Sequence, residues 1–171
     1  YLNPYKMRLQ NKVIIVTGST TGIGKAIAIR SVAEGAKVVI HGLEEAWGKE
    51  VLAELGSGNA VLHIEDLSGE GAPERLVQLA VQTFGRLDAI VNNAAIVASS
   101  NLQTTDKLFL QRLLEVNTIA PFLLVKAALP YLTEQQGCVL NIGSVNAYSG
   151  EPNLLAYSVS KGGLMTLTRN L

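Results

Sequence analysis

The chain has 171 residues, 48% of them hydrophobic, and its 14 basic and 14 acidic side chains leave no formal net charge. This composition predicts one soluble globular domain with a substantial core. The charge balance predicts no nucleic-acid partner and no acidic membrane surface as partner, and no uninterrupted apolar run is long enough to predict a membrane span. Because Cys138 is the only cysteine, an internal disulfide and a cysteine-based metal site are excluded, and a reducing, cytoplasmic location is favoured.

Short apolar runs alternate with helix-like segments along the chain. The first run, residues 12–16, ends in the glycine-rich stretch TGSTTGIG, after which a helix is predicted over residues 24–34. Further strands are predicted over 37–40, 60–64, 89–91 and 138–142, with helices over 44–55, 73–84 and within 106–132. This alternation is typical of βαβ crossovers. It predicts a doubly wound parallel sheet of the Rossmann type, in a three-layer α/β/α domain that spans residues 1–171.

The glycine-rich stretch is a candidate phosphate-binding loop. Gly18, Gly22 and Gly24 lie between the first strand and its helix, where glycine permits a tight turn. A backbone without side chains can approach a pyrophosphate that lies at the positive end of the following helix. An ordinary turn is the alternative interpretation, and the glycine spacing differs from the usual G-x-G-x-x-G.

The second candidate site lies near the other end of the chain. Tyr157 and Lys161 are four residues apart, so on a helix they share a face, and an ammonium near a phenol favours the phenolate. Ser144 follows an apolar strand, where its hydroxyl could hold a substrate oxygen. Taken singly, these residues are better interpreted as a core tyrosine, a solvated lysine and a turn serine.

Several motifs occur together and in a familiar order. TGSTTGIG, NNAA at residues 92–95, Asn117, Ser144 and the YSVSK run at 157–161 resemble those of classical short-chain dehydrogenases/reductases, from about Gln10 to the last residue. Ala95 stands where that family usually has glycine. The resemblance implies an oxidoreductase acting on CH–OH groups, which transfers a hydride between NAD or NADP and a secondary alcohol or ketone.

The resemblance also implies roles for individual residues. Tyr157 is the general acid in reduction and the general base in oxidation, and Ser144 binds the reacting oxygen. Lys161 assists Tyr157 and binds the nicotinamide ribose, and Asn117 holds a water for proton relay. No metal is implied. Coenzyme contacts are implied for Gly18, Ser19, Thr21, Gly22, Ile23, Gly24, Asp66, Leu67, Asn93, Ala94, Tyr157 and Lys161.

The sequence does not decide between NAD and NADP. An acid about 20 residues after the glycine loop selects NAD, and a nearby arginine favours the 2′-phosphate of NADP. Gly42 and Leu43 supply neither, although Glu44 and Glu45 follow closely. Thr21 stands where many NADP-using relatives have a basic residue.

The chain ends at Leu171, whereas members of the family continue through further strands and a substrate-covering segment. We therefore expect a sheet truncated before its last strands, without the C-terminal part that covers the substrate. The identity of the small-molecule alcohol or carbonyl substrate is not predicted. A homodimer or homotetramer is expected by analogy.

Two other functions compete with the dehydrogenase. One is a catalytically silent, nucleotide-sensing Rossmann protein, which would be expected to lack Ser144, Tyr157 or Lys161. The other is an extended-family epimerase, which usually has a different glycine spacing. The single residues His41, His63 and Trp47 are interpreted as packing or strand-end residues, and Cys138 as a small buried hydrophobe.

Overall fold

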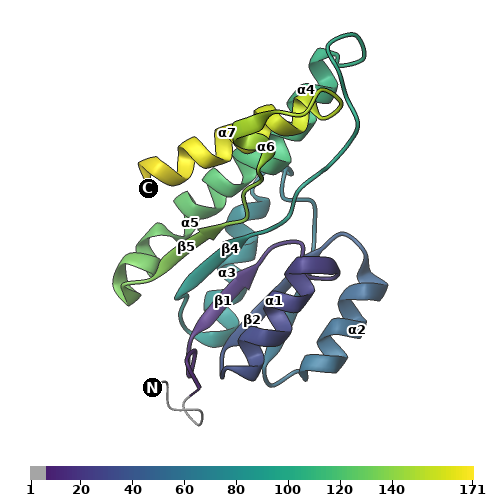
Figure 1. Ribbon diagram of the computed structural model, residues 1–171. Coiled ribbons are helices and arrows are strands. Elements are labelled where there is room, and N and C mark those ends of the chain that lie inside the picture. Colours follow the sequence, from purple (N-terminus) through teal and green to yellow (C-terminus); the bar gives the residue numbers. More distant parts are fainter. Residues whose placement is uncertain (1–6) are drawn as a thin grey trace, which may run out of the picture.

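The computed structural model describes residues 7–171, and its strands and helices alternate along the chain (Figure 1). The strands are β1 (Val13–Val16), β2 (Lys37–Gly42), β3 (Ala60–Ile64), β4 (Ala89–Asn92) and β5 (Cys138–Asn141). The helices are α1 (Gly22–Ala33), α2 (Glu45–Leu55), α3 (Ala72–Phe84), α4 (Lys107–Leu114), α5 (Ala120–Gln135), α6 (Asn146–Ser149) and α7 (Leu155–Asn170). A π-helical turn, η1 (Glu115–Ile119), joins α4 to α5.

The five strands form one parallel sheet in the order β3-β2-β1-β4-β5. The order reverses direction between β1 and β4, so the loops after these two strands diverge and leave a crevice at the carboxyl edge of the sheet. The predicted doubly wound, Rossmann-type sheet is therefore confirmed.

The helices cover both faces of this sheet. Alternate residues of β1 point to opposite sides, since Val13 and Ile15 belong to one apolar cluster and Ile14 and Val16 to another. The first cluster is completed by α3 and α5, and the second by α1 and α2. Figure 1 shows α1 and α2 on one side of the sheet and α3 on the other. The three-layer prediction is confirmed, and the central strands are buried on both faces, which explains their unbroken apolar sequences.

One continuous helix, Lys107–Gln135, is long and apolar enough by length and composition alone to cross a membrane, and an 18-residue stretch of it has a mean hydropathy of 1.4. The sequence predicts a helix within residues 106–132, and the structure extends it to Gln135. In the folded domain Leu124, Ala128 and Leu132 of this helix pack into the core beside the sheet. A buried core helix can meet the same criteria of length and composition as a membrane-spanning helix.

The interpretation of Cys138 as a buried residue was wrong. Within the described residues β5 is an edge strand, and its outward-facing Cys138 and Leu140 are exposed while Val139 packs against the core. An edge strand has a neighbour on one side only, so its apolar residues lose cover that a central strand would provide.

Candidate active site

A cleft of about 610 Å³ opens where the loops after the parallel strands meet α7. It is lined by the β1–α1 loop, the end of β2, the turn after β3, the end of β4 and the first half of α7. Residues from both ends of the chain therefore share one hollow. The sequence-predicted site residues that line it are Gly18, Thr21, Gly22, Ile23, Asp66, Leu67, Asn93, Ala94, Tyr157 and Lys161.

The glycine loop has the geometry of an anion cradle. Gly18 and Gly22 have positive φ angles of 61° and 56°, which glycine adopts without strain. A Cβ at Gly24 would lie 2.3 Å from the Gly18 carbonyl oxygen, so loop and helix approach too closely for any side chain there. Thr21 gives α1 no side-chain cap, and the first turn of α1 carries no acidic residue. The free N–H groups at this helix start fit a dinucleotide pyrophosphate.

Two residues that pack the loop from behind do not line the cleft. Gly24 is buried in the helix start, and Ser19 is fully buried. The Ser19 hydroxyl donates to the Val16 carbonyl at 2.6 Å and accepts from the His41 N–H at 3.0 Å. The side chain of Ser19 thus holds the loop in shape, and the coenzyme contact implied for this residue stays a prediction.

The loop is also attached to the end of β4. Thr17 Oγ1 accepts the main-chain N–H groups of Asn93 and Ala94, both at 3.0 Å. In return, Asn93 Nδ2 donates to the carbonyls of Thr17 and Gly18 at 2.9 and 3.0 Å. Thr17 was not among the predicted site residues, although it begins the glycine motif, and it aligns the two strand ends that flank the crevice.

Asp66 lies in the turn after β3, and its carboxylate has fixed partners. Oδ1 accepts the N–H and hydroxyl of Ser68, and Oδ2 accepts from Arg112 Nη2 at 2.5 Å. Partial burial would raise the pKa of Asp66, but the hydrogen bonds from Arg112 and Ser68 outweigh it and lower the pKa. Arg112 also lines the cleft, and sequence reasoning missed it because it comes from α4, far along the chain.

Tyr157 and Lys161 share one face of α7, as their spacing predicts. Lys161 is only 2% exposed, and its Nζ lies 5.9 Å from the centroid of the Tyr157 ring. The same ammonium donates to the Ile142 carbonyl at 2.7 Å. Burial lowers the pKa of Lys161, which places a poorly solvated cation beside the phenol.

Asn117 lies fully buried in η1, away from the cleft. Its Oδ1 accepts the Ile96 N–H, and its Nδ2 donates to the Ile96 carbonyl and to Ser160 Oγ, all within 2.9 Å. These bonds use both amide hydrogens, so the side chain ties η1 to the β4 loop and to α7. The side chain of Asn117 thus joins three segments of the chain at a π-helical turn.

Ser144, like Asn117, is a catalytic candidate that does not line the main cleft. It borders a smaller hollow of about 240 Å³, which meets the main cleft at Gly143. The Ser144 hydroxyl accepts the Asn146 N–H at 3.2 Å, at the start of α6. Ser144 therefore stands beside the cleft that holds Tyr157 rather than in its wall.

A further serine, which sequence reasoning missed, positions α7. Ser100 accepts the Ala156 N–H on its hydroxyl at 3.0 Å, and its carbonyl accepts the Leu155 N–H. It is 3% exposed and holds the first turn of the helix that carries Tyr157. A serine within a polar loop gives no signal in sequence that would separate it from its neighbours.

The end of β2 forms the wall where NAD and NADP differ. Gly42, Leu43, Glu44 and Trp47 line the cleft there, and a Cβ at Gly42 would lie 2.5 Å from Thr20. The wall contains an acid but no arginine at this strand end. Among residues 7–171, no three His, Cys, Asp or Glu side chains are grouped so as to hold a metal ion.

The sheet order, the glycine loop and the cleft define a Rossmann-type α/β protein. The family model described as short chain dehydrogenase matches residues 12–171. The chain therefore belongs to the short-chain dehydrogenase family, whose members use NAD or NADP, and the resemblance inferred from its motifs is confirmed.

Curated relatives align with almost the whole chain. An uncharacterized oxidoreductase of Thermotoga maritima is 39% identical over 96% of the chain and 66% of its own length. The 2-(S)-hydroxypropyl-CoM dehydrogenase 3 of Xanthobacter autotrophicus is 36% identical over 96% and 66%. The meso-2,3-butanediol dehydrogenase of Serratia marcescens is 36% identical over 95% and 65%. The chain thus spans slightly less than two thirds of the length of these relatives.

Proposed function

We propose that the protein is an NAD(P)-dependent oxidoreductase that transfers a hydride between nicotinamide and a secondary alcohol or ketone, with Tyr157 as the general acid/base. The observation that carries this proposal is the shared cleft. The glycine cradle lines one part of it, and Tyr157 lines another beside the Lys161 ammonium. A nucleotide site and a proton-transfer group therefore face the same hollow.

The nicotinamide coenzyme supplies the hydride chemistry when it is bound. In reduction the Tyr157 hydroxyl gives its proton to the carbonyl oxygen, and in oxidation the phenolate takes it back. The Lys161 ammonium lies beside the Tyr157 ring, and the Ile142 carbonyl holds it in place. Ser144 receives the substrate oxygen from its position beside Gly143, and the main chain of η1 at Asn117 holds the relay water.

The substrate class is supported by the relatives. The names of the Xanthobacter and Serratia proteins give 2-hydroxypropyl and 2,3-butanediol groups, both of which are secondary alcohols. The protein is cytoplasmic in this proposal, and it forms a homodimer or homotetramer through the long helix and α7. Exposed apolar side chains on these helices support that assembly: Leu108, Ile119, Phe122, Leu129 and Val159.

The proposal is tested by incubating the full-length protein with NADH or NADPH and a panel of small ketones. Oxidation of the coenzyme that depends on the ketone is expected. Tight coenzyme binding without turnover of any ketone would favour the silent nucleotide sensor instead. Light scattering on the same protein measures the assembly, and a monomer would contradict the proposed contact between long helices.

A further inference from the structure

His41 is a buried histidine that both lines the cleft and touches the glycine loop. It lies in β2 and is 3% exposed. The Gly18 N–H donates to its Nδ1 at 3.3 Å, and its Nε2 lies 2.8 Å from the Glu65 carbonyl oxygen. Since a main-chain N–H can only donate and a carbonyl can only accept, Nδ1 carries no proton and Nε2 carries one. The two partners together select the neutral Nε2–H tautomer.

The imidazole thus spans two backbone segments that are distant in sequence. Gly18 belongs to the glycine loop after β1, and Glu65 immediately precedes Asp66 in the turn after β3. Both segments line the cleft, through Gly18 on one side and Asp66 on the other. The main chain of His41 is fixed as well, because its carbonyl accepts the Ser19 N–H at 2.7 Å.

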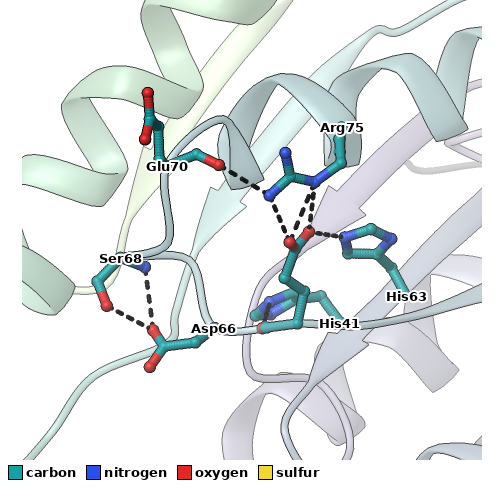
Figure 2. A network of polar contacts seen from close by, with 7 residues as sticks. His41, His63, Asp66, Ser68, Glu70 and Arg75 are labelled. Atoms are coloured by element: carbon teal, nitrogen blue, oxygen red, sulfur yellow. Dashed lines mark hydrogen bonds and ion pairs between the residues drawn. The ribbon is translucent and has the colours of Figure 1, made fainter.

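Figure 2 shows a group of polar residues beside His41, which includes His63 and Arg75. The ring of His63 stacks on that of His41, with centroids 6.2 Å apart. His63 Nε2 lies 2.9 Å from Glu65 Oε2, and Arg75 binds the same carboxylate through Nε and Nη2. Arg75 and His63 therefore both hold the side chain of Glu65, whereas His41 contacts its main-chain carbonyl.

We propose that His41 is a positioning residue for the coenzyme: its neutral ring, anchored on the Glu65 carbonyl, accepts the Gly18 N–H and so fixes the glycine loop. This inference rests on the proposed function, in which that loop binds the pyrophosphate of the coenzyme. This role goes beyond the packing role that the sequence predicts for His41, and the glycine motif does not include the residue.

Two substitutions test the hydrogen bonds of the two ring nitrogens separately. In His41→Asn the amide oxygen takes the place of Nδ1 and keeps an acceptor for Gly18, while the bond to Glu65 is lost. In His41→Gln the amide nitrogen reaches the place of Nε2 and keeps the donor to Glu65, while the Gly18 N–H loses its acceptor. Because an unsatisfied buried N–H is costly, we expect His41→Gln to weaken NADH or NADPH binding by about tenfold or more, and His41→Asn by about threefold or less.

The experiment measures dissociation constants of NADH and NADPH for the wild type, both His41 variants and the control His63→Gln, with thermal unfolding of each. His63 is stacked on His41 but does not touch the loop, so its variant is expected to bind within about twofold of the wild type. A structural role alone would weaken binding in proportion to lost stability. The inference requires the Gln variant to bind more weakly than the Asn variant even where their stabilities agree.

The outcomes distinguish this inference from the proposed function. If the wild type binds neither coenzyme, the proposed function fails and the inference with it. If the wild type binds but the Asn and Gln variants bind equally well, only the inference is overturned. Nitrogen NMR of the His41 ring is an independent check: an unprotonated Nδ1 and a protonated Nε2 are expected, and the opposite tautomer would overturn the inference.

Discussion

At the scale of single residues, the cleft depends on two buried basic side chains in opposite states. Lys161 donates to the Ile142 carbonyl, and burial lowers its pKa, whereas His41 is held neutral between a donor and an acceptor. A charge in a poorly solvated position has a stronger field at its neighbour than the same charge in water. Lys161 is therefore suited to act on Tyr157, and His41 to act on the backbone.

Removal of the ammonium is expected to impair two functions at once. Lys161→Ala should lower ketone reduction and weaken coenzyme binding together, because the lysine serves both the phenol and, in the proposed site, the ribose. Lys126→Ala on α5 removes an exposed lysine and serves as the control. Steady-state kinetics with varied coenzyme measures both quantities, and loss of turnover with unchanged coenzyme affinity would contradict the double role.

The histidine has a consequence for stability in acid. Burial lowers the pKa of His41 from 6.5 to about 4, so between these values the unfolded chain binds a proton that the folded chain excludes. The contribution of His41 to the free energy of unfolding is fully present above pH 6.5 and decreases as the pH is lowered. The loss reaches about 3 kcal/mol by about pH 4.

Urea unfolding of the wild type and His41→Asn across this pH range measures that loss. The wild type should lose stability between about pH 6.5 and 4, and the variant, which has no group to titrate there, should show a flatter profile. The carboxylates with lowered pKa values, such as Glu65 and Asp66, affect stability mainly at pH values below the range in which His41 titrates. Parallel profiles for the two proteins would show that His41 is protonated in the folded state.

At the scale of elements, the start of α1 is the most tightly constrained. Gly24→Ala places a methyl group against the Gly18 carbonyl and 2.5 Å from Asn93 Nδ2, so the loop must move away. We expect weaker coenzyme binding by about tenfold or more, with destabilisation of about 1–3 kcal/mol. Gly58→Ala is the matched control, because no atom lies within 4 Å of its added Cβ. Normal coenzyme binding by the Gly24 variant would argue against the cradle.

The π-turn η1 depends on one amide side chain. Asn117→Ala leaves the main-chain groups of Ile96 without partners and releases Ser160 of α7. Because Asn117 and Ser160 are fully buried and Ile96 is partly buried, we expect a loss of about 2–4 kcal/mol in the free energy of unfolding. Asn170→Ala removes an exposed amide from α7 and should change stability by less than about 0.5 kcal/mol. Similar losses in both variants, measured by denaturant unfolding, would contradict the structural role of Asn117.

At the scale of the whole molecule, periodicity made the fold predictable from sequence. Apolar runs such as 13–16 and 38–40 are separated by helix-length segments, and this alternation leaves few topologies other than a doubly wound sheet. The glycine loop and the Tyr157–Lys161 pair were predictable too, since each depends on residues that are close in sequence. The prediction of burial failed at Cys138, where the strand lies at an edge.

The contacts that complete the site could not be predicted in this way. Gly18 and His41 are 23 positions apart, and Asp66 and Arg112 are 46 positions apart. Each pair meets only after the strands have taken their order in the sheet, and no local pattern specifies the meeting. The separation of Ser144 from the main cleft has the same origin, because it depends on how α6 and α7 pack together.

The central claim is that the Tyr157 hydroxyl supplies the proton in a cleft that binds the coenzyme independently of it. Tyr157→Phe removes that single oxygen and retains the ring beside Lys161, so the comparison of this variant with the wild type isolates the claim. The measurement is single-turnover oxidation of bound NADH or NADPH by the ketone that the wild type reduces fastest, with the coenzyme dissociation constant measured in parallel. We predict a rate lower by about 10²–10⁴-fold and a dissociation constant within about threefold of the wild type. A variant that reduces the ketone at a rate near that of the wild type would contradict the account.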